Sequence, residues 1–542
     1  MKKLILLCAI TLCVTIAHAG AWTWASSLIS TGMVRAWDLG GSSLNPAIWV
    51  GGQYDGSMSF NGIDYPSAGM SDAFVAKYSR EGTPLWFRQF GSPDEDVCLS
   101  IEAGTGGTDN CYLTGYFNDV MSVGSTVLTS AGMWDVFLGK LSPGGDVLWL
   151  KRFGGTLNDI GYGITVDHED NVIVAGWFAD TIDFGGGISI SSYGGSDMFV
   201  AKFDPQGTCL WAKHAGDEGV DYGYKVDCSE TGYIYVTGVA GQGANFDGIS
   251  QSQDGLFVAK YSYDGSIMWV SSALGAGPIN IGIGKQDLLQ YRGMVTGRVT
   301  GTAIFGDHVI SSVDGSDDIF LAEFSPGNGT WINVQRWGGT GSDKGRAVDV
   351  HDYMGSLTVA SYENSVDFGC SILNSNGVWD CALLKGGPQA AAVGFGSINT
   401  DVVSDVKRAL MNKAITCGWY NGSMRLGNIL LNSGSDAIQS GFIGMYDFDA
   451  VATDDPILPP PVGLSCYPNP FSNSLEISSK EKTISKLQVF NQRGQLVRDL
   501  EHTSPNTWRW DGQDSQGNLC ATGIYLIRSA ELRSFQKVLL LR

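Results

Sequence analysis

Positive charge, histidine and the common catalytic motifs are all scarce in this chain of 542 residues. Charged residues make up only 16% of it, and 34 lysines and arginines stand against 55 aspartates and glutamates, for a net charge of -21. So acidic a chain has little positive charge with which to neutralise phosphates, which excludes nucleic acid as a partner. No G-x-S-x-G, H-E-x-x-H or P-loop pattern occurs, so no motif identifies a reaction.

Long apolar segments are also missing, except at the N-terminus. Two lysines precede an apolar run, Leu4–Ile16, which is followed by the triplet Ala17-His18-Ala19. A basic start, a short apolar core and an A-x-A end are typical of a secretory signal peptide, here residues 1–19, with Gly20 opening the mature chain. The run is too short to cross a bilayer. A buried N-terminal strand or helix is the alternative.

Glycine, by contrast, is abundant. The 74 glycines are about twice the usual share, and many tight turns would account for them. A glycine-rich, weakly charged, exported chain favours an all-β fold, and the internal repeats make that expectation specific.

One repeat dominates the sequence between the leader and residue 450. Its pattern is Asp-x-Phe-Val-Ala-Lys-Tyr, then a glycine turn, then tryptophan, as in Asp72–Tyr78 with Gly82 and Trp86. A period this regular indicates an array or a propeller. The aligned positions, separated by 63, 62, 58, 63, 62 and 60 residues, are Phe74, Phe137, Phe199, Phe257, Phe320, Ala382 and Phe442.

Each period also contains other strand-like segments rich in β-branched and aromatic residues. In the third unit they read ITVD (Ile164–Asp167), VIVAGWF (Val172–Phe178), MFVAKFD (Met198–Asp204) and CLWAKHA (Cys209–Ala215). Four antiparallel strands per radial unit are the pattern of a propeller blade. A linear β-solenoid is the alternative, although its repeats are usually much shorter.

The chain ends predict how the ring closes. The segment Ala21–Trp24 reads AWTW and resembles the tryptophan-bearing fourth strand, which the seventh unit lacks after Phe442–Phe448. We therefore expect the N-terminal strand to complete the last blade, which removes the exposed edges of an open array. The prediction is a seven-bladed β-propeller over residues 20–450.

The third unit carries the clearest resemblance to a known family. Its residues Phe153-Gly154-Gly155, Asp159, Gly161–Gly163, Ile164–Asp167 and Asn171–Gly176 resemble the bacterial seven-bladed β-propeller repeat. The resemblance covers most of residues 21–450. It implies a fold and no particular reaction.

The cysteines suggest cross-strand disulfides. Three pairs flank turns symmetrically, and residues facing each other across a hairpin can meet the geometry of a disulfide in an oxidising compartment. Ordinary buried thiols are the alternative, and no C-x-x-C or Cys/His spacing indicates zinc. The pairs are Cys98 with Cys111, Cys209 with Cys228, and Cys370 with Cys381, with Cys466 and Cys520 as a further possible pair that leaves Cys417 alone.

Residues 451–462 break the repeat with a stiff, proline-rich linker. Beyond it, residues 463–542 alternate apolar and polar residues between glycine, asparagine and aspartate turns. This pattern predicts a small antiparallel β-sandwich.

This tail has a set of motif residues: Tyr467, Pro468, Asn469, Pro470, Phe471, Gly494, Trp510, Gly512, Gly523, Tyr525 and the basic, apolar end with Lys537. In these residues it resembles the type A C-terminal sorting domain of the type IX secretion system, and also the Ig-like domain of flagellar hook-capping proteins. The resemblance implies recognition by outer-membrane secretion machinery, then cleavage or attachment to surface lipopolysaccharide. A plain Ig-like accessory module is the alternative.

Candidate catalytic or binding residues are few. Aspartates recur after glycine-rich turns, at Asp96, Asp159, Asp221 and Asp343, and this periodicity predicts hydrogen bonds to turn backbone. Weak calcium binding is the alternative, although none has EF-hand spacing, and no other cofactor is expected. His168 and His214 are expected to be surface or turn residues in preference to a catalytic base. The repeated tryptophans are expected to pack between blades in preference to lining a sugar site.

Two functional classes remain. The first is a non-enzymatic secreted or cell-surface protein that binds a glycan or protein on one propeller face. The second is a secreted polysaccharide hydrolase or lyase, which requires at least two carboxylates or an Arg/His/Asp group converging in the central channel.

Overall fold

The computed structural model contains strands and no helix among the residues it describes. These are residues 20–41, 47–105, 107, 109–283, 292–351, 355–387, 390–410, 412–450, 464–467, 471–479, 486–491, 495–504, 506–529 and 535–541. Within these ranges, therefore, no helix is long and apolar enough to span a membrane. The predicted signal peptide and linker lie outside them. The chain divides into two compact units, Met1–Ala452 and Thr453–Arg542.

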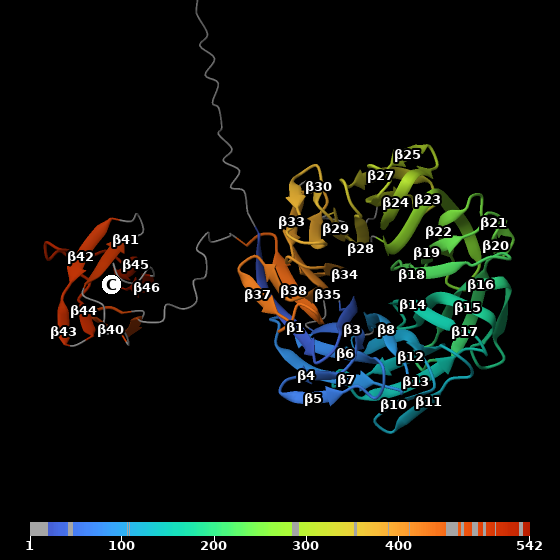
Figure 1. The fold of residues 1–542 in the computed structure, drawn as a ribbon, viewed down its shortest axis with the longest axis horizontal. Coiled ribbons are helices and arrows are strands. Elements are labelled where there is room, and N and C mark those ends of the chain that lie inside the picture. The colour runs from blue at the N-terminus through green and yellow to red at the C-terminus, as the bar shows by residue number, and fades with distance from the viewer. Residues whose placement is uncertain are drawn as a thin grey trace, which may run out of the picture. The chain divides into compact units, whose positions relative to one another are not determined.

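The first unit is a β-propeller. The described strands form seven sets of four antiparallel strands, arranged radially around a centre (Figure 1). Two neighbouring sets share the long strand β23, and one set is extended by β4 and β5. We number these blades 1 to 7 along the chain. Neighbouring innermost strands contact each other all the way round, including that of blade 7 with that of blade 1. The prediction of an all-β propeller is confirmed.

The innermost and second strands of blades 1 to 7 line and support the channel. The innermost strands are β2 (Val34–Gly40), β8 (Val97–Ala103), β14 (Asp159–Val166), β18 (Tyr222–Cys228), the second half of β23 (Ile267–Ile283), β28 (Lys344–His351) and β34 (Asp401–Leu410). The second strands are β3 (Ala47–Tyr54), β9 (Cys111–Phe117), β15 (Val172–Asp183), β19 (Ile234–Ala240), β24 (Gly293–Phe305), β29 (Gly355–Tyr362) and β35 (Lys413–Asn421).

The third and outer strands complete each blade. The third strands are β6 (Asp72–Ser79), β12 (Asp135–Leu141), β16 (Ser189–Phe203), β22 (Gly255–Tyr261), β26 (Asp317–Phe324), β32 (Asp380–Lys385) and β38 (Gln439–Asp447). The outer strands are β7 (Pro84–Phe90), β13 (Val147–Phe153), β17 (Cys209–Ala215), the first half of β23, β27 (Trp331–Trp337), β33 (Ala391–Phe395) and β1 (Ala21–Ser30).

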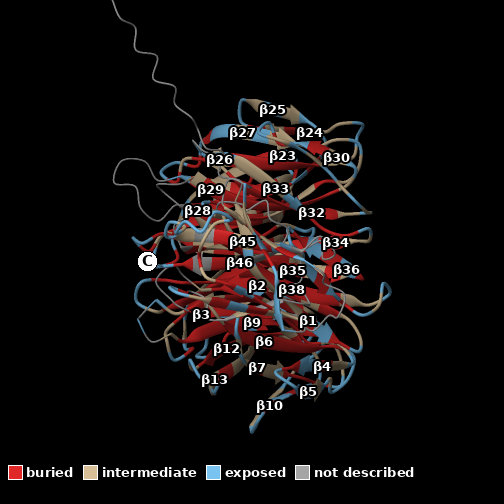
Figure 2. Ribbon diagram, turned by 90° about the vertical axis from the view of Figure 1, so that its left-hand side faces the viewer, coloured by how far each residue is buried: buried red, intermediate tan, exposed pale blue. Residues whose placement is uncertain are grey.

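Short strands extend the connections between second and third strands, and most of the exposed residues lie in such connections while the blade strands are largely buried (Figure 2). They are β4 (Ser57–Phe60), β5 (Ile63–Pro66), β10 (Val120–Val123), β11 (Thr126–Thr129), β20 (Asn245–Phe246), β21 (Ile249–Ser250), β25 (His308–Ser311), β30 (Ser365–Asp367), β31 (Ile372–Asn374), β36 (Ser423–Leu426) and β37 (Ile429–Asn432).

The repeated phenylalanine packs over glycine within the blade. Phe199 on β16 lies opposite Gly176 on β15, and a Cβ at Gly176 would come within 2.8 Å of the Phe199 ring. The same pairing of an aromatic residue with glycine occurs in every blade except blade 6, where Ala382 faces Ala360. The repeat therefore preserves a fit inside the blade, because the ring occupies the space that a side chain on the second strand would fill.

The repeated tryptophan and lysine connect blades 1, 2 and 3 to the blade that follows each of them. The Trp86 indole N–H of blade 1 donates to the Pro143 carbonyl of blade 2 at 3.0 Å, and Lys77 Nζ donates to the same oxygen at 2.9 Å. Trp149 and Trp211 make equivalent bonds to the following blades. The prediction that the tryptophans pack between blades is confirmed.

The N-terminal strand closes the ring. β1 pairs antiparallel with β38 of blade 7, from Ala21 opposite Asp447 to Leu28 opposite Gly441. Its Trp24 indole donates to the Arg80 carbonyl of blade 1 at 2.9 Å, which repeats the contact between the other blades. The prediction that residues near Ala21–Trp24 supply the missing outer strand is confirmed.

The second unit is a sandwich of two four-stranded sheets with one apolar core between them. One sheet has the order β39 (Leu464–Tyr467), β40 (Leu475–Ser479), β44 (Thr507–Trp510) and β43 (His502–Ser504). The other has the order β42 (Leu496–Leu500), β41 (Leu487–Asn491), β45 (Gly523–Ser529) and β46 (Phe535–Leu540).

Candidate functional site in the central channel

Every innermost strand has a β-bulge at the same place. In blade 3 the register shifts between Gly161 and Gly163, which leaves Tyr162 as the extra residue. A bulge changes the direction in which the side chain of the extra residue points. Here the seven bulged residues are all partly exposed near one end of the channel. They are Trp37, Leu99, Tyr162, Tyr224, Ile279, Arg346 and Ser404.

Charged side chains meet in the channel directly after the bulges. Lys225 Nζ of blade 4 lies 2.8 Å from Asp38 Oδ1 of blade 1, so this ion pair spans the ring. Ser100 donates its hydroxyl to Asp38 Oδ2 at 2.6 Å and accepts from Lys225 at 3.3 Å. Both oxygens of Asp38 are therefore engaged, and its side chain is buried.

A second buried carboxyl lies beside this ion pair. Asp405 Oδ2 accepts the backbone N–H of Leu39 at 3.1 Å. Burial, followed by the neighbouring Asp38 carboxylate, raises the pKa of Asp405 well above its usual value. Burial acts in the same direction on Asp38, but Lys225 and Lys407 outweigh it and the pKa of Asp38 is lowered. The pKa values of the two carboxyls are thus shifted in opposite directions.

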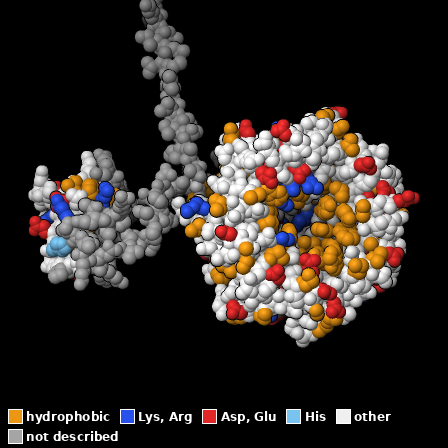
Figure 3. Space-filling view, in the orientation of Figure 1, with side chains coloured by type: hydrophobic (Ala, Val, Ile, Leu, Met, Phe, Trp, Pro, Cys, Tyr) orange, Lys and Arg blue, Asp and Glu red, His pale blue; other side chains and the backbone are white. Residues whose placement is uncertain are grey.

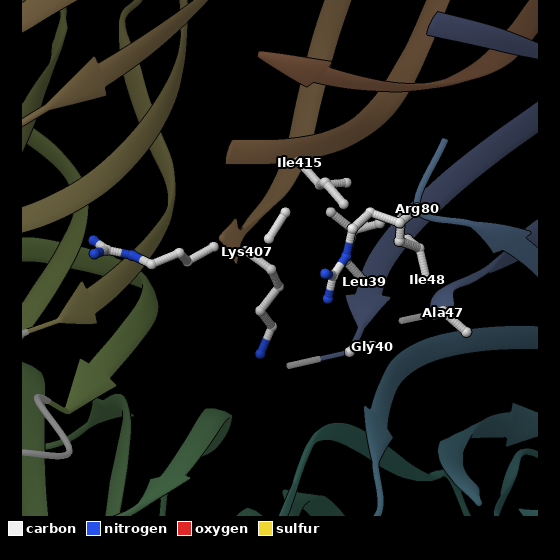
Figure 4. A pocket seen from close by; sticks show the side chains of 10 residues that line it. Leu39, Gly40, Ala47, Ile48, Arg80, Lys407 and Ile415 are labelled. Atoms are coloured by element: carbon white, nitrogen blue, oxygen red, sulfur yellow. The ribbon is translucent and has the colours of Figure 1, made fainter. Parts of the chain in front are cut away.

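The far end of the channel, where the innermost strands finish, carries both basic and acidic side chains. Lys407 Nζ lies 2.9 Å from Glu102 Oε2 and lines a small pocket with Arg80, Leu39 and Ile48. In Figure 4, Lys407 and Arg80 extend into this pocket from opposite sides. Its volume of about 20 Å³ has room for one water molecule, so this pocket does not accommodate a larger ligand.

Aromatic side chains lie close together at the opposite end of the channel, where the innermost strands begin. The Tyr162 and Tyr224 rings of adjacent blades lie 5.6 Å apart, and Trp177 lies 5.2 Å from Tyr222. All four are partly exposed. We call this end, with these four residues and Trp37, the aromatic mouth.

Basic residues adjoin the aromatic mouth from blades 5 and 6. Arg298 and Lys344 both lie 3.5 Å from Asp317 Oδ2. Lys344 and Arg346 both lie over the Trp379 ring, 4.7 and 5.5 Å from its centroid. Figure 3 shows one face of the propeller, with lysine and arginine side chains gathered around a central hollow and hydrophobic side chains beside them. This concentration of positive charge contrasts with the net charge of -21.

The recurring aspartates lie at the junctions between blades. Asp159 Oδ2 accepts the backbone N–H of Gly155 at 2.7 Å, and the backbone N–H of Asp159 donates to the Trp134 carbonyl of the preceding blade at 2.7 Å. The preceding blade supplies a second carboxyl, Asp135, held by Arg152 at 2.9 Å. The prediction that these aspartates bind turn backbone is confirmed. Asp96, Asp221, Asp343 and Asp401 accept backbone N–H groups in the same way.

These carboxyl pairs should make the propeller less stable as pH rises. Burial, with a further contribution from Asp135, raises the pKa of Asp159 to about 8, and Asp96 is raised to the same value. The folded state then binds more protons than the unfolded state between about pH 4 and pH 8, so its stability is greatest at the acidic end. One pKa unit corresponds to about 1.4 kcal/mol, so the loss is on the order of several kcal/mol for each such group.

Denaturant unfolding at pH 5 and pH 8 measures this effect. We expect Asp159→Asn to reduce the difference between the two pH values, while Asp146→Asn, a change at an exposed carboxyl, leaves it unchanged. An unfolding free energy that rises from pH 5 to pH 8 in the unmodified chain would contradict the prediction.

Four histidines, His168, His214, His308 and His502, lie outside the innermost strands. His214 Nδ1 lies 2.9 Å from Asp197 Oδ2 at a blade junction, and His502 packs against Trp508 at 4.4 Å in the second unit. His168 is in a turn after β14, and His308 begins β25. Across the described ranges no group of three or more His, Cys, Asp or Glu is placed to hold a metal ion.

The predicted disulfide pairs are wrong in register. Cys98 lies opposite Gly115 and Cys111 opposite Ala103, because Cys111 is the first residue of β9 while Cys98 lies well before the end of β8 at Ala103. Cys209 and Cys228 belong to blades 3 and 4 and have separate partners, Phe203 and Ile234. Cys381 pairs with Ser361 and Phe395, whereas Cys370 is in an exposed turn. The thiols of Cys98, Cys111, Cys209, Cys370, Cys381, Cys417 and Cys466 are free.

The described residues of the tail motif belong to one core. Phe471 packs 5.3 Å from Trp510, which lies 4.9 Å from Tyr525, and the Tyr525 hydroxyl donates to the Ala521 carbonyl at 2.8 Å. Gly523 begins β45. The backbones of Tyr467 and Lys537 lie in β39 and β46, and the remaining motif residues, Pro468, Asn469, Pro470 and Gly494, lie outside the described residues.

The fold and the tail together define a class: an exported β-propeller repeat protein with a C-terminal sorting unit. Residues 465–539 match the family model of the secretion system C-terminal sorting domain. The chain is therefore exported by type IX secretion, to the cell surface or beyond it.

Individual relatives are distant. A WD repeat-containing protein of Acanthamoeba polyphaga mimivirus is 26% identical over 182 residues, which is 28% of this chain and 13% of that protein. The WD40 domain of Neurospora crassa Pan2 is 11% identical, with a TM-score of 0.39 over 76% of this chain and 89% of that one. A quinohemoprotein alcohol dehydrogenase from Comamonas testosteroni is 11% identical, with a TM-score of 0.36 over 80% of this chain and 77% of that one.

Proposed function

We propose that this exported protein is a non-enzymatic binding protein of the cell surface or surroundings. The propeller, residues 20–450, would hold a glycan or protein ligand at its aromatic mouth, and residues 463–542 would serve as the secretion and attachment signal read by outer-membrane machinery. The observation that supports this role is the bulge in every innermost strand. It brings partly exposed tyrosine, tryptophan and arginine side chains from separate blades to one end of the channel.

The channel centre is better suited to holding the ring together than to turnover. Asp38 is engaged by Lys225 and Ser100, and Glu102 by Lys407. A carboxylate whose oxygens are already occupied by fixed partners is not available to a substrate, although such a network couples opposite blades.

A glycan array probed with the purified chain tests the proposed binding role. We expect Tyr162→Ala combined with Tyr224→Ala to abolish the signals, because these rings face solvent at the mouth. The matched control is Tyr263→Ala, which removes a tyrosine that is 68% exposed in the turn after β22. Signals that survive the double change at the mouth would place the ligand elsewhere and overturn the proposed site.

A secreted polysaccharide hydrolase or lyase is the second candidate. The observation behind it is that Asp405 lies beside Asp38 and that their pKa values are shifted in opposite directions, since acid–base catalysis uses carboxyls of different proton affinity. Product analysis of the same polysaccharides after incubation separates the two candidates. Chain cleavage that Asp405→Asn abolishes would establish the second.

A further inference from the structure

Arg346 at the aromatic mouth has a buried group with no protein partner. It is the bulged residue of β28, and its Nε is buried without a hydrogen-bond partner in the structure. Burial above all, and also the neighbouring Arg298 charge, lowers the pKa of Arg346 to about 10. An arginine that loses hydration and gains no carboxylate is costly unless an anion supplies the missing acceptor.

The charges around Arg346 leave an excess of positive charge. Arg298 and Lys344 share one carboxylate, Asp317, which Thr300 also contacts. Glu363 accepts from the Trp379 indole and from the Ser342 backbone N–H. Three cationic side chains therefore lie near only two carboxylates, Asp317 and Glu363, and both carboxylates already accept hydrogen bonds.

The basic and aromatic sets form one surface. Arg298 acts electrostatically on the Tyr224 phenol, whose own ring contacts Tyr162 at 5.6 Å. On the other side, Lys344 and Arg346 lie over Trp379. A ligand with acidic groups and apolar faces repeated along its length satisfies both sets at once.

We propose that the aromatic mouth binds a polysaccharide whose pyranose rings carry carboxylate groups, with one carboxylate held by Arg346 and the rings stacked on Tyr162 and Tyr224. This deepens the proposed function and rests on it. Guanidinium donates two parallel hydrogen bonds to a carboxylate, and the C–H face of a pyranose is attracted to the negative face of an aromatic ring. Because the net charge of -21 repels a polyanion, the excess of positive charge at the mouth also favours binding there.

Calorimetric titration of the full chain with three polymers tests the proposal. They are polygalacturonate, the same polymer fully methyl-esterified, and polyglutamate, which has carboxylates and no sugar. We expect polygalacturonate to bind, and both esterification and replacement by polyglutamate to weaken binding at least about tenfold, the order expected for loss of a desolvated charge pair. Binding should also weaken as salt is added.

Variants of the chain locate the contact. Arg346→Met should abolish binding of polygalacturonate, Arg346→Lys should restore part of it, and Arg292→Met should leave it intact. Arg292 is an exposed arginine paired with Glu323 before the start of β24, and it serves as the matched control.

Each possible result of the titrations supports or overturns a part of the proposal. Equal binding of the methyl ester overturns the acidic ligand and leaves a binding mouth in place, and equal binding of polyglutamate overturns the saccharide. No binding of any of the three polymers overturns this proposal, while the glycan array still tests the binding role separately.

Discussion

Removing residues 463–542 is expected to abolish appearance of the propeller outside the cell while leaving its fold and stability unchanged. The sorting match lies entirely in this unit, which has its own apolar core. The propeller core is closed by its own strands, β1 with β38, and needs nothing from the tail. Immunoblots of the medium and of surface-labelled cells, with thermal unfolding of the purified propeller, measure both parts of the prediction.

A point change should reproduce the truncation. Trp510 is fully buried between Phe471 and Tyr525, so Trp510→Ala should cost about 3–5 kcal/mol. The free energy of unfolding of a domain of this size is rarely more than about 3–5 kcal/mol, so the tail would unfold and export would fail. Leu519→Ala, at a site that is 68% exposed, is the control. Normal surface levels of the truncated chain would disprove the assigned route.

Removing Ala21–Ser30 from the mature propeller is expected to abolish its cooperative unfolding. The deletion strips β38 of its neighbour over the run from Ala21–Asp447 to Leu28–Gly441 and leaves an exposed edge that promotes aggregation. It also removes the Trp24 contact with Arg80, through which the outer strand of blade 7 is tied to blade 1. Denaturant unfolding and light scattering of the two chains provide the comparison.

Two adjacent residues of β1 offer a milder test. Leu28 is 1% exposed and Ile29 is 38% exposed. Leu28→Ala should lower the unfolding free energy by about 2–5 kcal/mol, whereas Ile29→Ala should cost far less, because only the first leaves a cavity. Equal losses at the two positions would mean that β1 contributes backbone pairing and no core.

The repeat made the blades predictable because each repeated residue makes its contacts within its own blade or with the neighbouring blade. Phe199 fits over Gly176 one strand away, and Trp149 reaches a turn that follows it by 56 residues. Neither contact depends on the ring as a whole. The aspartates after glycine turns were likewise predictable, since Asp159 accepts an N–H only four residues away.

The disulfide prediction failed for a reason that the sequence does not display. Counting outward from a turn requires the position of its centre, but β9 begins at Cys111 and β8 continues past Cys98 to Ala103, so the turn is not centred between the two cysteines. For Cys209 and Cys228 the assumed hairpin is a crossing between blades 3 and 4. Only strand pairing reveals such shifts and boundaries.

By itself the sequence determined the all-β repeat, the closing N-terminal strand and the sorting tail, because each follows from a pattern confined to one unit or one end of the chain. The tertiary structure alone decided the channel. Asp38 and Lys225 are 187 residues apart and belong to opposite blades, and Arg346 comes from a third. Closure of the ring brings Asp38 and Lys225 into contact and places Arg346 at the mouth of the same channel. The spacing of these residues along the chain does not predict their distances across the ring.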